Sequence, residues 1–388
     1  MAKYEDLGVS PHKPDVMNAL IGIDQGLFPK AFCKAVPDIF TGSDDHCVLL
    51  HADGAGTKSS LAYLQYKENG DPSIFEKIAQ DSLVMNLDDL ICVGATGPFL
   101  LSNTIGRDAK VIGKEIIKAL IHGYEKQIAV LKEHGVEINS CGGETADVGD
   151  LVRTVIVDAT VFTRMRRQDF IDTSAVKPDQ DIVGFASFGQ AIYEAEYNSG
   201  IGTNGFTTAR HKLLGKDYRE FTESYSPEIS NLAYSGAFNL SDKLEGTNMT
   251  VGEALLSPTR TYSPVIKKIL PKYKKHISAI FNNTGGGQTK CLNFGENIKY
   301  HKNNLFDLPP IFKLLKERTD LSYHEFYRVF NVGHRLEIVC DRSVSNELIG
   351  IANDFGIEAK VIGQTSTSDK RRELIIVSPE GEVVYTHA

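Results

Sequence analysis

The chain has 388 residues, of which 41% are hydrophobic and 24% charged, and its formal net charge is −8. This length predicts about two or three domains, and the composition is typical of a globular protein rather than a disordered or fibrous one. The negative charge argues against general nucleic-acid binding, which requires a basic surface, and no stretch reaches the ~18 apolar residues of a membrane span.

The N-terminal sequence and the cysteines predict a cytoplasmic protein. No apolar segment follows a basic start in MAKYED, as a secretory signal would require. The six cysteines are scattered without a C-x-x-C pair, mostly in apolar surroundings, which favours buried thiols over zinc ligands or disulfides. We therefore expect neither a membrane nor a nucleic acid among the partners of this chain.

Hydrophobic periodicity predicts strands and helices in alternation through the first half of the chain. Apolar residues recur at helical spacing over 73–93, and Gly94 follows as a stop signal. A second amphipathic helix is predicted before Gly135, over 111–134. Buried strands are predicted at 47–52, 99–105, 136–141 and 153–162. This alternation favours an α/β or α+β domain.

A polar run over 164–181 that contains Pro178 predicts a connection between two domains. We expect an N-terminal domain over residues 1–168 and a C-terminal α/β domain over 169–388. For the second domain the pattern predicts helices at 207–214, 264–273 and 344–355 and strands at 181–187, 336–340, 358–362 and 373–377. The acidic, polar segment 217–248 has no assigned role.

The segment HADGAGTK, residues 51–58, follows a predicted strand and has the composition of a phosphate-binding turn. Gly54 and Gly56 can adopt φ > 0 and let backbone N–H groups approach an anion. Lys58 adds positive charge, and Asp53 can hold a hard cation. The spacing is not that of a P-loop, and a plain tight turn is the alternative interpretation.

Three aspartates lie on the predicted helix 73–93, at Asp81, Asp88 and Asp89. At 3.6 residues per turn, Asp81 and Asp88 share a face, whereas Asp89 points away from the leucine stripe. A solvated acidic face is one interpretation. The acids fall near the C-terminal end of the helix, however, where the helix dipole disfavours negative charge, so a metal or a basic partner is expected to compensate them.

Two further glycine-rich segments carry polar groups. CGGET, residues 141–145, is predicted as a second turn after a strand, with a carboxylate at Glu144. Together, Asp53, Asp89 and Glu144 offer the oxygen ligands that Mg²⁺ prefers when it also binds phosphate. The third segment, NTGGGQ at 283–288, is by itself more often a loop than a site.

These segments, in this order, resemble the aminoimidazole ribonucleotide synthetase family, also called phosphoribosylformylglycinamidine cyclo-ligase. The resemblance runs nearly from end to end and consists of several short motifs in one order. They are YEDLGV at 4–9, DGAGTK at 53–58, the acidic helix at 81–90, GGET at 142–145, SG and NG at 199–205, LSPTRTY at 256–262, TGGG at 284–287 and YRVFNVG at 327–333.

The resemblance implies a fold and an activity. The fold is a two-domain α/β (α+β) structure in which an N-terminal four-stranded sheet pairs with its twin to close a barrel across a homodimer, followed by a C-terminal α/β domain. Closure would cover exposed sheet edges. The activity is a ligase reaction of purine biosynthesis: ATP phosphorylates an amide oxygen of formylglycinamidine ribonucleotide, and an amidine nitrogen attacks the activated carbon. The products are 5-aminoimidazole ribonucleotide, ADP and phosphate.

The resemblance also implies roles for particular residues, with ATP and Mg²⁺ as cofactors. The metal–nucleotide complex would be held by Asp53, Asp89 and Glu144, which with Lys58 form the expected catalytic set. Thr57 and Lys58 would contact phosphate. The residues expected to line the nucleotide site are Gly54, Gly56, Asp81, Gly142, Gly143 and Thr145. Those expected to face the substrate or the transferred phosphoryl group are Asn204, Gly205, Thr284, Gly285 and Gly286.

The chain departs from the family pattern at several positions. Gly202 stands where the family has a histidine in S-G-x-H-S-N-G, and Asp88 stands where it usually has asparagine. The segment 190–198 is longer than the family's turn, and Tyr193 or Glu194 in it is a candidate to replace the histidine. Tyr193 is preferred because a phenol donates a hydrogen bond and stays protonated at neutral pH.

Two alternative functions remain open from the sequence. One keeps the superfamily and its ATP chemistry but changes the reaction, to that of selenophosphate synthetase, thiamine-monophosphate kinase or the hydrogenase-maturation dehydratase. The motifs SPTR and YRVFNVG favour the purine enzyme over these. The other is a nucleotide-binding scaffold without turnover, against which the presence of Asp53, Lys58, Asp89 and Glu144 together weighs.

Overall fold

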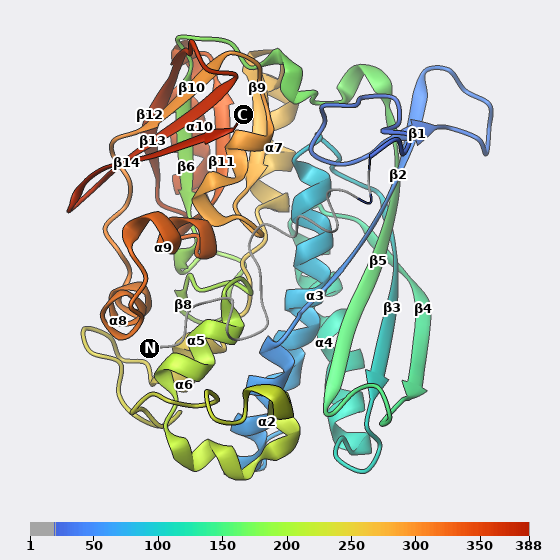
Figure 1. Cartoon of the computed structure of the whole chain (residues 1–388). Coiled ribbons are helices and arrows are strands. Elements are labelled where there is room, and N and C mark those ends of the chain that lie inside the picture. The colour runs from blue at the N-terminus through green and yellow to red at the C-terminus, as the bar shows by residue number, and fades with distance from the viewer. Residues whose placement is uncertain (1–18, 20, 388) are drawn as a thin grey trace.

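The structure, a computed structural model, describes residue 19 and residues 21–387 (Figure 1). The YEDLGV segment at 4–9 lies outside the described residues. The described residues form two separate β-sheets, each with its own helices, and a small two-stranded ribbon of β7 (Phe188–Gly189) and β8 (Asn198–Ser199). Among the described residues no helix is both long and apolar enough to cross a membrane.

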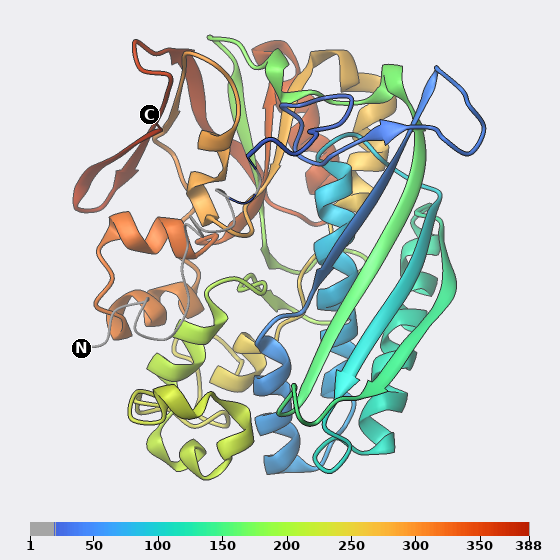
Figure 2. The same ribbon diagram turned by 45° about the vertical axis from the view of Figure 1, so that its right-hand side comes forward.

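The first sheet has the strand order β1-β2-β5-β3-β4, in which only β3 and β4 run parallel. Two helices, α3 and α4, lie along one face of it (Figures 1 and 2). The bounds are β1 (Val36–Pro37), β2 (His46–Gly54), α2 (Lys58–Asn69), α3 (Ile74–Ile91), β3 (Phe99–Arg107), α4 (Lys114–Glu133), β4 (Ile138–Asp147) and β5 (Val155–Arg166).

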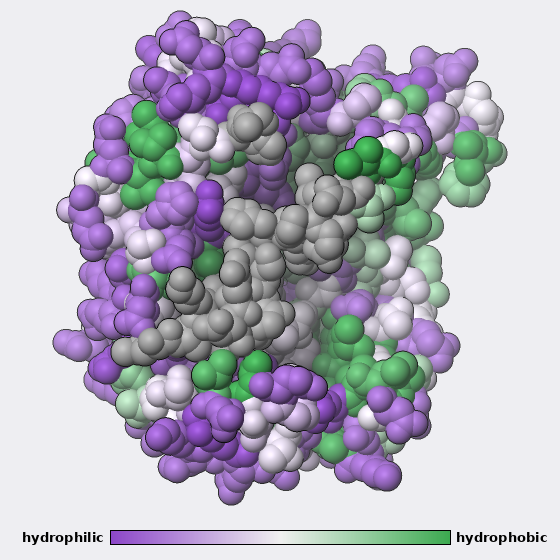
Figure 3. Space-filling view, in the orientation of Figure 1, coloured by the Kyte–Doolittle hydropathy of each residue, from purple (hydrophilic) through white to green (hydrophobic). Residues whose placement is uncertain are grey.

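Alternating side chains explain why this sheet has one covered and one open face. Leu49 on β2 is buried against the helices, whereas its neighbour Leu50 is 69% exposed on the opposite face. Leu50, Phe162 and Leu100 lie opposite one another on three adjacent strands, so they form an apolar row across the open face. Apolar residues are also visible on this side of the molecule, at the right of Figure 3.

The second sheet has the order β14-β13-β10-β12-β6-β11-β9, and every residue of β6, β9 and β11 is buried. Strands that are buried along their whole length are expected when both faces of a sheet are covered. Its strands are β6 (Asp181–Ala186), β9 (Ile277–Asn282), β10 (Ile298–Lys302), β11 (His334–Cys340), β12 (Ala359–Thr367), β13 (Arg372–Ser378) and β14 (Gly381–His387). The helices of this half are α5 (Phe206–Leu213), α6 (Val251–Leu255), α7 (Ser263–Tyr273), α8 (Pro310–Arg318), α9 (Tyr323–Val329) and α10 (Ser345–Asp354).

Helix α3 joins the two halves, because it packs on β2 and β5 and also contacts α7 and β9 (Figure 1). It ends where Gly94 adopts φ +88°, and a Cβ at this glycine would lie 2.8 Å from the Asp169 carbonyl oxygen. Only glycine fits this close approach. The three aspartates of α3 therefore lie between the two sheets.

Most predicted elements are confirmed to within a few residues, and the chain has the expected mixed α/β fold. One interpretation is wrong: residues 142–145 do not form a turn after a strand but lie inside β4, which continues to Asp147. Likewise, His51 to Gly54 belong to β2, and only 55–57 form the turn. The unassigned segment 217–248 contains three short 3₁₀ helices, at Lys216–Glu220, Thr222–Ser224 and Pro227–Ile229.

Candidate functional site

Each aspartate on α3 faces a different basic partner. Asp81 pairs with Lys58, Asp88 with Arg335 and Asp89 with His51. Asp81 and Asp88 are fully buried, so the interpretation of these two residues as a solvated acidic face is wrong. The expected compensation by basic partners is confirmed, since unpaired buried carboxylates would be strongly unfavourable.

Lys58 is fully buried, and its ammonium group has three oxygen partners. It donates to Asp81 Oδ1 at 3.0 Å, to the Gly202 carbonyl at 3.2 Å and to the Ser257 carbonyl at 2.5 Å. Thr259 also binds the same carboxylate oxygen, through its amide at 2.7 Å and its hydroxyl at 2.6 Å. Burial lowers the pKa of Lys58 and raises that of Asp81, while their mutual attraction opposes both shifts. These hydrogen bonds connect Lys58, at the start of α2, to the segments around Gly202 and Ser257 in the second half of the chain.

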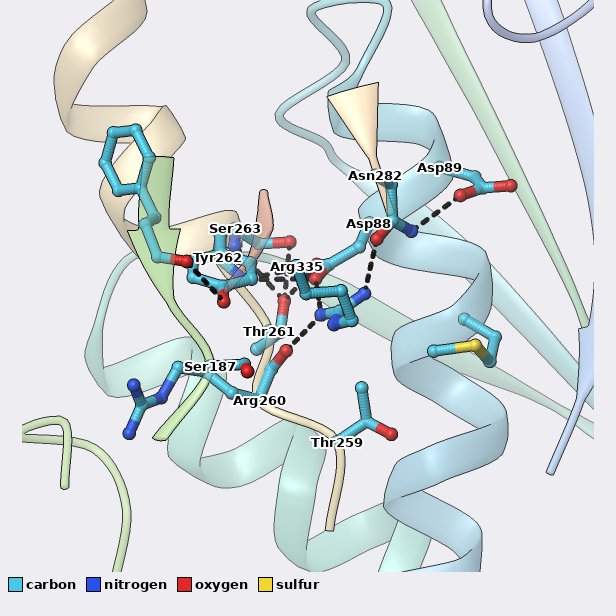
Figure 4. A network of polar contacts seen from close by, with 12 residues as sticks. Asp88, Asp89, Ser187, Thr259, Arg260, Thr261, Tyr262, Ser263, Asn282 and Arg335 are labelled. Carbon is cyan, nitrogen blue, oxygen red and sulfur yellow. Dashed lines mark hydrogen bonds and ion pairs between the residues drawn. The ribbon is translucent and has the colours of Figure 1, made fainter. Parts of the chain in front are cut away.

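Asp88 and Arg335 form the second buried pair (Figure 4). The Arg335 guanidinium donates to Asp88, to the Arg260 carbonyl and, at 2.6 Å, to Asn282 Oδ1. The Thr261 hydroxyl donates to Asp88 at 2.6 Å. Burial raises the pKa of Asp88, and Arg335 opposes that shift. The extra charge at Asp88, relative to the family's asparagine, is therefore balanced by an arginine of the chain itself.

Asp89 is the most accessible of the three acids and lies near Asp53. Its side chain is 14% exposed, its Oδ1 accepts a hydrogen bond from Asn282 Nδ2 at 2.7 Å, and its Oδ2 lies 3.2 Å from His51 Nε2. Asp53 is exposed at the end of β2. Nearby protein atoms that displace water, together with the charge of Asp89, raise the pKa of Asp53. A divalent cation would relieve this repulsion between carboxylates.

Glu144 lies far from this pair within one chain. Asp53 on β2, Ala159 on β5, Asn103 on β3 and Gly143 on β4 are successive partners across the sheet. Three strand spacings therefore separate Asp53 from the Gly142–Thr145 segment, or about 14 Å. The shared metal set of Asp53, Asp89 and Glu144 remains a prediction, and a single chain brings together only its first two members.

The two glycine turns expected to face phosphate meet at the start of α5. Thr57 Oγ1 lies 3.2 Å from Thr207 Oγ1, which joins the DGAGTK turn to the first turn of this helix. Gly205 precedes α5 with φ +70°, and Asn204 beside it is partly exposed. The hydroxyl of Thr203 reaches the Met85 sulfur at 3.2 Å, which places this turn against α3.

A buried ion pair, Lys302–Glu337, holds the residues that flank the TGGG turn. Lys302 donates to Glu337 at 2.5 Å and to the carbonyl and side-chain oxygens of Gln288, at 2.9 and 3.1 Å. Asn283, which precedes Thr284, donates to Glu337 at 2.7 Å. Gly285 is exposed and Gly286 partly exposed, so the turn presents backbone to solvent while its two flanking side chains are held in the core.

Tyr193 does not replace the absent histidine. Its hydroxyl is buried and donates to the Thr261 carbonyl at 2.5 Å, and its ring packs against His134 and Phe355. The hypothesis that this phenol donates to a substrate phosphate is therefore wrong. Glu194 is already paired within the chain, because its carboxylate accepts hydrogen bonds from Arg260 Nε, at 2.9 Å, and from Arg260 Nη2, at 2.5 Å.

Several residues at this junction were not identified from the sequence. They are His51, Asn282, Lys302 and Arg335, which lie on β2, β9, β10 and β11 and contact the acids or anchor the glycine turns. For Arg335 the available signal was a cation directly before the predicted strand 336–340. Such a cation requires an acidic partner.

Comparisons with known proteins agree with this architecture. Residues 34–165 match the family model described as "AIR synthase related protein, N-terminal domain". A phosphoribosylformylglycinamidine cyclo-ligase of Methanocaldococcus jannaschii is 28% identical over 376 residues, which cover 95% of this chain and 93% of that protein. A relative of the same name from Methanococcus vannielii is 27% identical over 396 residues, covering 98% of this chain and 99% of that protein.

Among solved structures, the chain is similar to one of a HypE–HypF complex, with a TM-score of 0.56 and 14% identity over 96% of this chain and 98% of that one. Thermotoga maritima PurL complexed with FGAR has a TM-score of 0.53 and 12% identity, and this chain spans 49% of its length. These two likenesses concern the fold alone. The part of the chain that the family model matches, residues 34–165, contains almost the whole of the first sheet. Along almost its whole length, the chain is similar to relatives named phosphoribosylformylglycinamidine cyclo-ligase.

Proposed function

We propose that this chain is a phosphoribosylformylglycinamidine cyclo-ligase, which uses ATP to close the imidazole ring of 5-aminoimidazole ribonucleotide. The observation that carries the proposal is the full-length similarity to relatives of that name, which extends through both halves of the chain. The N-terminal residues 1–168 would bind the nucleotide and form the dimer, and residues 169–388 would complete the site. The cytoplasmic location stays a prediction.

The contacts support a site for ATP and substrate at the junction of α2, α3, α5 and β9. ATP would convert the amide oxygen into a phosphate leaving group, so that the protein chiefly has to position the reactants and neutralise charge. Thr57, Asn204 and the exposed part of the TGGG turn would face the phosphates and the substrate. Lys58 would act as a positioning residue, because its ammonium group holds the Gly202 carbonyl beneath the α5 turn.

Asp53 and Asp89 fit a Mg²⁺ ion, because both offer hard carboxylate oxygens and Asp89 raises the pKa of Asp53. Bound there, the ion would offset the negative charge of the phosphates. Glu144 would join this set through a second subunit. Its strand β4 is an edge of the sheet, β1–β2 form the opposite edge, and a barrel of two sheets would join such edges.

The open apolar face supports the homodimer. Leu50, Leu100 and Ile156 are 69%, 43% and 42% exposed on the first sheet, which is unusual for strand residues of a protein that works alone. Burial of this face between two chains would give an interface of obligate character. Sedimentation at micromolar concentration should show a dimer, and a stable folded monomer of 42.7 kDa would contradict the shared barrel.

The decisive test is incubation of the purified chain with ATP, Mg²⁺ and formylglycinamidine ribonucleotide. An aminoimidazole product formed in step with ADP supports the proposal, whereas ATP hydrolysis without that product contradicts it. Mixing Asp89→Asn with Glu144→Gln subunits tests the shared site. Activity restored in the mixture would show that Glu144 acts across the dimer, and two inactive variants that stay inactive when re-associated would place it elsewhere.

A further inference from the structure

Three donor atoms of different chemistry converge beside the carboxylates described above. Cys33 Sγ, one ring nitrogen of His51 and one carboxylate oxygen of Asp89 all lie within 4.8 Å of one another. They come from the loop before β1, from β2 and from the last turn of α3. Cys33 is buried, whereas His51 and Asp89 are 21% and 14% exposed, so an ion can enter from the solvent side.

The imidazole of His51 is held in one orientation by a second layer of hydrogen bonds. Its Nδ1 lies 3.0 Å from Asn86 Oδ1. The amide of Asn86 donates to the Asp53 and Ser82 carbonyls, at 3.1 and 3.0 Å, which assigns its oxygen as the acceptor and places a proton on His51 Nδ1. His51 Nε2 is then the atom that faces Asp89. A hydrogen bond from the other ring nitrogen to a protein oxygen is usual for a metal-binding histidine.

The other two donors are also fixed. Asn282 binds Asp89 Oδ1 at 2.7 Å and leaves Oδ2 directed at His51 Nε2, 3.2 Å away. The Cys33 thiol lies 3.2 Å from the Asp89 carbonyl oxygen, at the C-terminal end of α3. A nitrogen–oxygen separation of this size is near that of two ligands on one tetrahedral ion with bonds of about 2 Å. The Cys33 sulfur lies within 4.8 Å of the other two donor atoms, so it is in range to become the third ligand.

We propose that Cys33, His51 and Asp89 form a binding site for Zn²⁺ or a divalent transition-metal ion of similar ligand preference. A thiolate and an imidazole suit such ions, whereas Mg²⁺ prefers oxygen ligands throughout. Binding would release the thiol proton and any proton on Nε2 to solvent, and would leave a fourth position for water. The site does not depend on the proposed enzymatic function, although an ion bound there would withdraw Asp89 from Mg²⁺.

The test is a Co²⁺ titration of the full chain after treatment with a chelator, because Co²⁺ reports thiolate ligands by absorption. The wild-type chain should bind one Co²⁺ with a thiolate-to-cobalt band in the near ultraviolet, and Zn²⁺ but not excess Mg²⁺ should abolish the band. Cys33→Ser should remove the band, and His51→Gln should weaken Co²⁺ binding by about tenfold or more.

Two matched controls separate this site from other thiols. Cys141→Ser removes an exposed cysteine and Cys92→Ser a buried one beside the end of α3, and both variants should keep the band. Absence of a thiolate band in the wild type, or its persistence in a folded Cys33→Ser variant, would overturn the proposal. If Cys33→Ser fails to fold, His51→Gln decides: unchanged Co²⁺ affinity and spectrum also overturn it. Because the readout is absorption without ATP, failure of the metal site and failure of the cyclo-ligase proposal remain distinguishable.

Discussion

Two ionic clusters of this protein differ in their access to solvent. The cluster at Asp53 and Asp89 lies at the edge of the first sheet, where Asp53 is exposed and His51 is the only basic side chain paired with Asp89 among the described residues. The cluster at Lys302 and Glu337 is fully enclosed in the second sheet. Carboxylates of the first kind remain available to a ligand, whereas the second kind can act only by holding other residues in place.

The largest expected effect follows from breaking the enclosed cluster. Lys302→Met would leave the Glu337 carboxylate buried without its cation, which is expected to lower the free energy of unfolding by about 3–5 kcal/mol. Urea unfolding monitored by circular dichroism measures it. Lys126→Met, which removes the exposed Lys126–Glu76 pair, is the matched control and should change stability by less than about 1 kcal/mol. Equal effects of the two substitutions would contradict the distinction between clusters.

The enclosed cluster should also respond to acid in a defined direction. Burial raises the pKa of Glu337, but Lys302 and His334 outweigh it and lower the pKa from 4.5 to about 2. A lowered carboxyl pKa stabilises the fold above pH 4.5, and this contribution is lost as the pH falls towards 2.

The stability difference between the wild type and Glu337→Gln should therefore be constant from pH 7 to about pH 5 and smaller by about 1 kcal/mol at pH 3.5. Urea unfolding at these three pH values measures it. A difference that grows as the pH falls would mean that the pKa of Glu337 is raised rather than lowered.

In the open cluster the expected loss concerns turnover rather than stability. Asp89→Asn keeps the shape of the side chain but removes a charge that would hold the metal–nucleotide complex, so kcat should fall about 10²-fold or more. The Mg²⁺ concentration required for activity should rise. Asp88→Asn is the control one residue away: it breaks the buried pair with Arg335, so it should lower stability without changing the Mg²⁺ dependence. Near-normal turnover and Mg²⁺ dependence in Asp89→Asn would contradict the assignment.

The same contrast explains what the sequence predicts and what it does not. Helix α3, its acidic residues and their need for basic partners follow from periodicity and helix electrostatics. The identity of the partners does not, because Asp88 meets Arg335 across 247 positions of sequence through the packing of two sheets. GGET was mistaken for a turn because its two glycines indicate a break, whereas Gly142, with φ +83°, lies in β4 beside a register shift between β3 and β4.

The smallest expected effect concerns Tyr193, which is buried like the residues of the enclosed cluster. Tyr193→Phe removes the hydrogen bond to the Thr261 carbonyl and leaves that oxygen buried without this donor, which is expected to cost about 1–2 kcal/mol of stability. Since Thr261 in turn binds Asp88, a slight shift at α3 is expected, and kcat of the folded enzyme should change by less than about threefold, or roughly 0.6 kcal/mol. Tyr66→Phe, which removes the more accessible hydrogen bond to Glu115, is the control and should change neither quantity measurably. A tenfold loss of kcat in Tyr193→Phe with normal stability would show that the phenol reaches the substrate in a conformation other than this one. Tyr193 would then act with the solvent-accessible residues rather than with the enclosed ones.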